Sequence, residues 1–341
     1  MGSGQDRSIG PETVIALTGA SAGVGRAVAR MLGSRKASVG LLARGIDGLE
    51  AARREVTAAG GRAIALPVDV ADAAAVEETA GRIESELGPI DVWINDAMTS
   101  VFSPVHQTTP DEYRRVTEVT YLGAVHGTLS ALRRMRERDR GVIVQVGSGL
   151  AYRSIPLQSA YCAAKQAVRG FTESLRTELI HERSGVGVTM VQLPALNTPQ
   201  FGWVRSRLPH KAQPLPPIFQ PEVAAEAILW AAEHVPRELY VGAPTELAIL
   251  GQKIAPGLMD RYFAAVAWDG QMHDGPEDPA RPDNLFRPLP GDHGAHGAFD
   301  KRARDHSPHL WLATHPLWYR GAVLGFGLAT AVWASRRPRG Y

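Results

Sequence analysis

Short apolar segments alternate with amphipathic segments over most of the chain. From residue 13 to about residue 254, runs without a polar face are separated by stretches in which apolar residues repeat with a helical period. A strand buried on both faces of a parallel sheet has this continuous apolar pattern. We expect strands at residues 13–19, 37–44, 62–70, 91–97, 141–148, 187–194 and 238–243.

The order of these segments predicts the fold class. Helical stretches such as residues 48–60 and 74–88 lie between the expected strands. Regular strand–helix alternation is typical of a doubly wound α/β sheet. The sequence therefore predicts a Rossmann-type parallel sheet of about seven strands, with helices on both faces and a C-terminal extension.

Composition divides the chain into four parts. Residues 1–11 are expected to be a flexible N-terminus without the apolar core of a signal peptide, and residues 12–254 form the α/β domain. Residues 255–310 are polar and rich in Pro and Gly, so we expect an extended or loosely docked arm. Residues 311–341 form an apolar segment flanked by arginines.

Charge and cysteine content restrict the function classes. A net charge of +2 gives no indication of a nucleic-acid partner. The single cysteine, Cys162, excludes an internal disulfide and fits a reducing compartment. We interpret Cys162 as a small packing residue on a helix, not as a nucleophile.

The first expected strand ends in a glycine-rich turn that opens a helix. Gly19 permits a tight turn, Gly23 lets the backbone approach a pyrophosphate, and Gly25 allows close helix packing. The helix N-terminus supplies free N–H groups for phosphate. We therefore expect a dinucleotide here, with Ser21 and Val24 of the same turn in the site; the alternative is a glycine-rich surface turn.

The end of the second strand indicates which dinucleotide. Ala43 stands where NAD sites usually carry a carboxylate for the ribose, and Arg44 follows it. An arginine pairs with a 2′-phosphate, which a carboxylate would repel. The sequence thus favours NADP(H) over NAD(H), unless Arg44 stacks on adenine or points to solvent. Asp69 and Val70, at the end of the third strand, are expected near the adenine.

A tyrosine and a lysine four residues apart suggest proton-transfer chemistry. Tyr161 and Lys165 lie one helical turn apart, on the same helix face. A nearby fixed cation stabilises a phenolate, which lets a tyrosine exchange a proton near neutral pH. The alternative is an ordinary surface pair.

With TGASAGVG at the first turn and YCAAK on a later helix, the chain resembles the classical short-chain dehydrogenases/reductases over roughly residues 12–254. The resemblance implies that Tyr161 is the general acid/base. Lys165 would lower its pKa and bind the nicotinamide ribose, and Ser148 would hold the substrate oxygen. Ser148 also fits a helix cap.

Further cofactor residues follow from the same resemblance. The segment PALNTP resembles the family's Pro-Gly-x-x-Thr pattern, which implies that Pro194 shapes the nicotinamide pocket and Thr198 binds the carboxamide. Asn95 and Ala97 retain two positions of the family's Asn-Asn-Ala-Gly segment.

Four positions depart from the family pattern. Asp96 and Met98 replace an asparagine and a glycine, Ala195 replaces the glycine after the pocket proline, and Thr120 stands where the fourth catalytic residue is usually Asn. Asp96, Met98 and Thr120 motivate an alternative function, an NADP(H)-binding scaffold or sensor with little turnover. Because the proton donor is retained, an active enzyme is favoured.

The expected reaction transfers a hydride between NADP(H) and a carbonyl or secondary alcohol. Residues 100–105 and 193–220 should line the substrate pocket, and the apolar residues of the second segment favour a hydrophobic substrate or pack that loop onto the domain. The family resemblance implies a homodimer or homotetramer. His293 and His296 lack a third ligand, so we expect no metal site.

The C-terminus carries an uncharged run, residues 321–334, with aromatic and arginine residues at its ends. A helix of this run spans about 21 Å, less than a bilayer core of about 30 Å. Interfacial aromatics and arginines favour membrane contact through residues 318–339. We expect a cytoplasmic enzyme whose tail lies on the inner membrane face; the alternative is a helix packed on protein.

Overall fold

The structure is a computed structural model, and it describes residues 7–315. Its centre is a parallel sheet of seven strands in the order β12-β7-β6-β4-β1-β2-β3. All seven strands coincide with the expected apolar runs, which confirms the predicted fold class. Their bounds are β1 Val14–Thr18, β2 Ser38–Ala43, β3 Arg62–Pro67, β4 Val92–Asn95, β6 Gly141–Ser148, β7 Val186–Leu193 and β12 Glu238–Tyr240.

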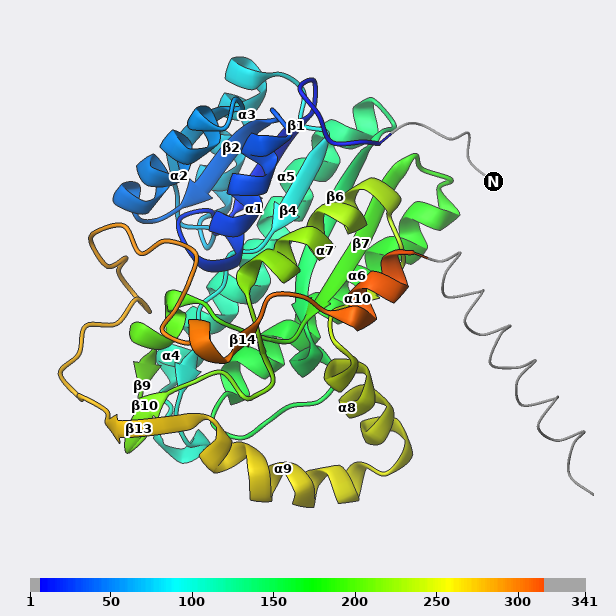
Figure 1. Ribbon diagram of the computed structural model, residues 1–341. Coiled ribbons are helices and arrows are strands. Elements are labelled where there is room, and N and C mark those ends of the chain that lie inside the picture. Colours follow the sequence, from blue (N-terminus) through cyan, green and yellow to red (C-terminus); the bar gives the residue numbers. More distant parts are fainter. Residues whose placement is uncertain (1–6, 316–341) are drawn as a thin grey trace, which may run out of the picture.

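Helices cover both faces of this sheet (Figure 1). One face carries α1, α2 and α7, and the other carries α3, α5 and α6. The bounds are α1 Gly23–Ser34, α2 Ile46–Ala58, α3 Ala73–Leu87, α4 Pro110–Thr117, α5 Gly123–Glu137, α6 Ser159–His181 and α7 Pro221–His234. The helices bury the apolar strands on both sides, as their sequence pattern requires.

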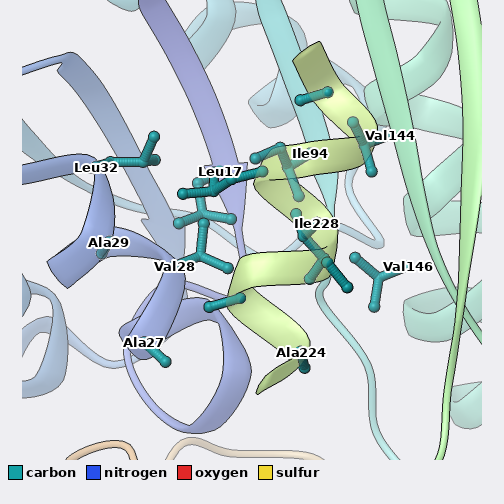
Figure 2. Close-up of a cluster of buried hydrophobic side chains, with 14 of the residues drawn as sticks. Leu17, Ala27, Val28, Ala29, Leu32, Ile94, Val144, Val146, Ala224 and Ile228 are labelled. Atoms are coloured by element: carbon teal, nitrogen blue, oxygen red, sulfur yellow. The ribbon is translucent and has the colours of Figure 1, made fainter. Parts of the chain in front are cut away.

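Figure 2 shows part of the core between the sheet and its first face. Val28 of α1 and Ile228 of α7 are fully buried beside Leu17, Ile94 and Val144 of three neighbouring strands. Burying a side chain of this size stabilises a fold by about 1.5–3 kcal/mol. This core holds the first turn of α1 against the carboxyl ends of β1 and β4.

The strand order reverses between β1 and β4, because β2 and β3 lie on one side of β1 and the later strands on the other. In doubly wound folds, ligands bind outside the carboxyl ends of the strands at this switch point. Here β1, β4, β6 and β7 end at Thr18, Asn95, Ser148 and Leu193. The expected site residues follow these ends directly.

Short strands and helices outside the sheet build a second layer around this edge. The strands pair as β5 with β9, β10 with β13, and β8 with β11 and β14. Their bounds are β5 Val101–Phe102, β8 Ala195–Leu196, β9 Arg205–Ser206, β10 His210–Ala212, β11 Ile218–Phe219, β13 Met272–Pro276 and β14 Ala303–Arg304. Single helical turns lie at Val105–Gln107, Gly149–Ala151, Pro199–Gly202 and Asp300–Arg302, a π-helical turn at Glu118–Leu122, and α10 at Pro308–Thr314.

The region after residue 254 is more ordered than its composition predicts. Helix α8 covers Ala243–Ile254 and α9 covers Pro256–Gly270, so the expected polar arm begins with a full helix. The expectation of a loosely docked arm is wrong, because Leu285, Ala295 and Phe299 are all buried. The arm docks through a few apolar side chains that its polar composition conceals.

The predicted membrane contact, residues 318–339, lies outside the described residues. Between residues 7 and 315, the structure has no helix whose length and apolar character would allow it to cross a membrane.

Candidate active site

The glycine turn between β1 and α1 has the backbone that the sequence predicts. Gly19 has a φ of +75°, and a Cβ atom there would lie 2.9 Å from the backbone nitrogen of Ala97. A Cβ atom on Gly25 would lie 2.3 Å from the carbonyl oxygen of Gly19. No side chain caps the start of α1, and its first N–H group, that of Gly23, donates to the backbone carbonyl of Gly294 at 3.0 Å. The turn therefore forms a cradle that a phosphate fits.

The loop after β4 is fixed against this turn. The Thr18 hydroxyl accepts the backbone N–H groups of Asp96 and Ala97 at 3.0 and 3.1 Å. Asn95, predicted to contact the cofactor, instead points into the protein. Its side chain accepts a hydrogen bond from the Trp93 indole at 2.8 Å and donates to Thr128 at 3.1 Å. The Asn95 amide therefore joins strand and helix and does not line the cavity.

Tyr161 and Lys165 lie on α6, beside Ser148 at the end of β6. The Tyr161 phenol lies close enough to the Ser148 hydroxyl for that group to lower the pKa of the phenol, and the Lys165 ammonium lies 5.7 Å from the centre of the tyrosine ring. Lys165 is buried and donates to the Val146 carbonyl at 2.6 Å. Ser148 also accepts the N–H of Leu150 at 3.1 Å, so it caps a short helical turn as well as contacting Tyr161. The three predicted side chains are thus brought together.

Burial sets the protonation of this group. Burial raises the pKa of the Tyr161 phenol, the Ser148 hydroxyl lowers it in part, and the nearby Asp96 carboxylate raises it. The pKa of Tyr161 is raised overall, because removing a phenolate from water costs more free energy than the Ser148 hydroxyl returns. Tyr161 is therefore a neutral phenol in this arrangement, ready to donate a proton.

Asp96, which is partly buried, and Lys165, which is buried, form an interacting pair. Burial raises the pKa of the Asp96 carboxyl, while the Lys165 charge and a hydrogen bond from the Gly25 backbone lower it. Burial lowers the pKa of Lys165, and the Asp96 charge raises it. This carboxylate, where the family pattern has an amide, couples the glycine turn to Lys165.

Thr120 does not occupy a position on the cavity wall. It lies in the π-helical turn between α4 and α5 and is buried. Its hydroxyl accepts the N–H of Thr99 at 3.1 Å and donates to the carbonyl of the same residue at 3.0 Å. The Thr120 side chain, expected to be catalytic, therefore has a structural role, because it holds the loop after β4 in place.

The adenosine end of the site carries more positive than negative charge. Arg44 donates to the backbone carbonyls of Asn284 and Leu285, and among the described residues it has no carboxylate partner. Arg115, which the sequence analysis missed, pairs with Asp69 and donates to the Leu285 carbonyl. Burial, and then the Arg115 charge, lower the pKa of Arg44. One guanidinium charge is left without an anion.

A single cavity of about 690 Å³ connects these groups. Among the predicted residues, Gly25, Asn95 and Thr120 do not line it. The cavity wall includes Gly19, Ser21, Gly23, Val24, Arg44, Asp69, Val70, Ala97, Ser148, Tyr161, Lys165, Pro194 and Thr198. A dinucleotide laid across the switch point would therefore reach from Arg44 to Tyr161.

The far end of the cavity is apolar and includes a wall that the sequence analysis missed. Phe201 and Trp203 of the expected substrate segment line it, whereas Ile218 and Phe219 are buried in the protein. Helices α8 and α9 supply the missed wall through the side chains of Leu247, Ala248, Met259, Tyr262, Phe263 and Val266. The sequence does carry a signal for α9. Its apolar residues from Met259 to Val266 are spaced three or four residues apart, as on one helix face, and they follow Pro256, a residue typical of a helix start.

His293 and His296, the two histidines considered as zinc ligands, contact different partners. His293 packs edge-on against Trp203, and His296 bonds Glu222 and Asp300. Within residues 7–315 there is no cluster of three or more metal-ligating side chains.

Comparison with known proteins places this site in a family. The sequence profile of the short chain dehydrogenases matches residues 13–208, which hold the glycine turn and the Tyr161–Lys165 pair. The chain belongs to the short-chain dehydrogenase family. An uncharacterized oxidoreductase of Bacillus subtilis, YxnA, is 34% identical over 278 residues, which are 81% of this chain and 78% of that protein.

Two further relatives are informative. A fatty acyl-CoA reductase of Acinetobacter baylyi is 28% identical over 249 residues, covering 72% of this chain and 81% of the reductase. The crystal structure of a metagenomic short-chain oxidoreductase in complex with NADP superposes with a TM-score of 0.57 and 27% identity, covering 69% of this chain and 98% of that one. The family is one of oxidoreductases that use a nicotinamide cofactor.

Proposed function

We propose that this protein is an NADP(H)-dependent oxidoreductase that interconverts a hydrophobic carbonyl compound and its alcohol. The observation that carries the proposal is that Ser148, Tyr161 and Lys165 line the same cavity as the glycine turn, with the Lys165 ammonium 5.7 Å from the centre of the tyrosine ring. The proposed proton donor and the glycine turn thus face the same cavity.

The side chains of the chain have distinct tasks in this reaction. NADPH, when bound, supplies the hydride. Ser148 and Tyr161 hold the substrate oxygen by hydrogen bonds, and Tyr161 gives its proton to that oxygen as negative charge develops there. Lys165 places a fixed cation beneath the phenol and stabilises the tyrosinate left behind. In the opposite direction, Tyr161 takes the alcohol proton.

Two features support NADP(H) over NAD(H). Arg44 lines the cavity with no carboxylate partner in the described part of the chain, and Ala43 offers no carboxylate to a ribose hydroxyl. A 2′-phosphate would compensate the free guanidinium charge by charge-assisted hydrogen bonds. The relative whose structure contains NADP adds support at the level of the family.

The substrate end favours a compound with an apolar chain. Leu247 and Val266 line the cavity and are also exposed, at 66% and 45%, so the apolar surface continues from the cavity to the outside between α8 and α9. A fatty acyl-CoA reductase among the relatives is compatible with this class. We expect activity on straight-chain aldehydes and ketones to rise with chain length and to be low on sugars.

The competing function is a scaffold or sensor that binds NADP(H) with little turnover. Asp96 motivates it, because its carboxylate raises the pKa of Tyr161. NADPH deuterated at the hydride position, incubated with a panel of aldehydes and ketones, separates the two. Deuterium in the alcohol product supports the enzyme, whereas tight NADPH binding without labelled product supports the scaffold.

A further inference from the structure

The chain after β13 crosses the open side of the cavity. We call residues 284–299 the strap; in Figure 1 they lie in the orange segment that runs from β13 past the ends of α1 and α2 and back toward β14. The strap lies beyond residues 13–208, the part that matches the family profile. Its contacts therefore add to the family's own site.

One end of the strap is anchored beside the adenosine end. Leu285 is fully buried against Val101, Val116, Ala160 and Ala164. Burial of this apolar side chain favours the docked position of the segment.

The other end is anchored beside the nicotinamide end. Ala295 and Phe299 are buried, and the Phe299 N–H donates to the side chain of Asn197 at 3.0 Å. Asn197 is itself buried next to Thr198, which lines the cavity. The strap is therefore held at two points, on opposite ends of the cofactor site.

Between the anchors, residues 286–293 are mostly exposed on their outer side. On their inner side, Pro288, Leu289, Gly291 and His293 line the cavity. A segment fixed at both ends, with one face to solvent and one to a cavity, closes that cavity without filling it.

Polar contacts join this middle span to the glycine turn. The Gly23 N–H donates to the Gly294 carbonyl at 3.0 Å, and Arg26 pairs with Asp292 at 3.1 Å. Arg26 is buried and also pairs with Glu55 at 2.7 Å, so its charge stays compensated when Asp292 moves away. Asp47 at the start of α2 accepts the Gly291 N–H at 2.7 Å. These contacts can open and close without unfolding the domain.

We propose that the strap is the outer wall of the dinucleotide site and that it controls the exit of NADP(H). The proposal rests on the proposed cofactor. With the strap in place, the backbone carbonyls of Asn284 and Leu285 orient Arg44, and the span from 286 to 293 blocks the way out. The cofactor leaves when the Asp292–Arg26 pair and the Gly294–Gly23 hydrogen bond separate.

A reversible crosslink tests this directly. A Cβ atom on Gly45 would lie 3.5 Å from the Cβ of Pro288, within the spacing of a disulfide, about 3.5–4.5 Å. The double variant Gly45→Cys/Pro288→Cys is loaded with NADPH while reduced and is then oxidised, with mass spectrometry to verify the bond. Native Cys162 is buried and 1% exposed, so it does not compete.

The readout is the rate of NADPH release, followed by its fluorescence during a chase with excess NADP⁺. The crosslinked protein should release NADPH at least about tenfold more slowly than its reduced form, and a reductant should restore the rate. The parent protein under the same oxidant is the control. If the verified crosslinked form and the reduced form released NADPH at equal rates, the proposal that the strap controls cofactor exit would be wrong.

A second variant opens the strap instead of locking it. Asp292→Asn removes the charge pair with Arg26 while keeping the side-chain size, and release should become about threefold to tenfold faster. Asp305→Asn, an exposed carboxylate in the same C-terminal region, is the charge-matched control and should leave release unchanged. An unchanged rate in Asp292→Asn would count against the strap. Failure of the parent to bind NADPH would instead overturn the proposed cofactor.

Discussion

The glycine turn and the strap face each other across one cavity, yet they are built in different ways. The turn has a strong local part, such as Gly25 against the carbonyl of Gly19, beside its contacts with the loop after β4. The strap depends on contacts between distant parts of the chain: Arg26 and Asp292 are 266 residues apart. A local contact is written into the sequence pattern, whereas a distant contact arises only when the domain has folded. The two walls should therefore respond differently to substitution.

The largest effect is expected in the turn. Gly25→Val forces side-chain atoms against the Gly19 backbone, where a Cβ atom alone comes within 2.3 Å. NADPH affinity should fall by about 100-fold, because the cradle must shift. Isothermal titration measures it, and thermal unfolding checks that the domain remains folded. Gly202→Ala, where a Cβ atom meets nothing within 4 Å, is the control.

The adenosine end comes next. Arg44→Ala removes the unpaired guanidinium, so NADPH affinity should fall by an amount on the order of 1–3 kcal/mol, whereas NADH affinity should change little. Titration of both cofactors into parent and variant gives the comparison. Equal NADPH and NADH affinities in the parent would mean that Arg44 does not select the phosphate.

A smaller effect, on rate more than on affinity, is expected in the strap. A Cβ atom on Gly297 would lie 2.4 Å from the Thr198 carbonyl oxygen, so Gly297→Ala should push the strap away from the cavity. Release of NADPH should speed up about threefold to tenfold, with a smaller change in Kd because entry speeds up too. Stopped-flow fluorescence measures both rates. If Gly297→Ala instead lowered NADPH affinity as much as Gly25→Val does, without faster release, the strap and the glycine turn would not differ in the way described.

The smallest effect concerns the carboxylate that links the turn to the lysine. The Asp96 charge raises the pKa values of Tyr161 and Lys165, so Asp96→Asn should lower both. Reduction needs the protonated phenol, so its alkaline limb should move to lower pH; oxidation needs the tyrosinate, so its acidic limb should move the same way. A shift of less than about one pH unit is expected in the profile of kcat/KM. Opposite shifts of the two limbs would contradict this coupling.

Local patterns predicted the fold and the centre of the site. The seven strands were visible because a strand covered on both faces is apolar along its whole length, and Tyr161 and Lys165 because four residues make one helical turn. Ser148 and the glycine turn follow strand ends, which the topology gathers at one edge of the sheet. These features need no knowledge of distant contacts.

Features that depend on distant packing were not predicted. Asn95 turns toward Trp93 and Thr128, and Thr120 turns toward the Thr99 backbone, because buried polar groups take the partners that the folded chain offers. The strap was taken for a loose arm because only Leu285 and a few other apolar residues anchor it in a polar segment. The average composition of a segment does not reveal a few apolar residues that anchor it.

We propose above all that Tyr161 gives its proton to the substrate oxygen while NADPH, bound in this cavity, supplies the hydride. Tyr161→Phe keeps the ring and removes the acid, so NADPH should bind with nearly the parent affinity. Hydride transfer to an apolar aldehyde, followed in a single turnover by NADPH absorbance, should slow by ~10²-fold or more. Single-turnover rates equal to those of the parent would contradict the account.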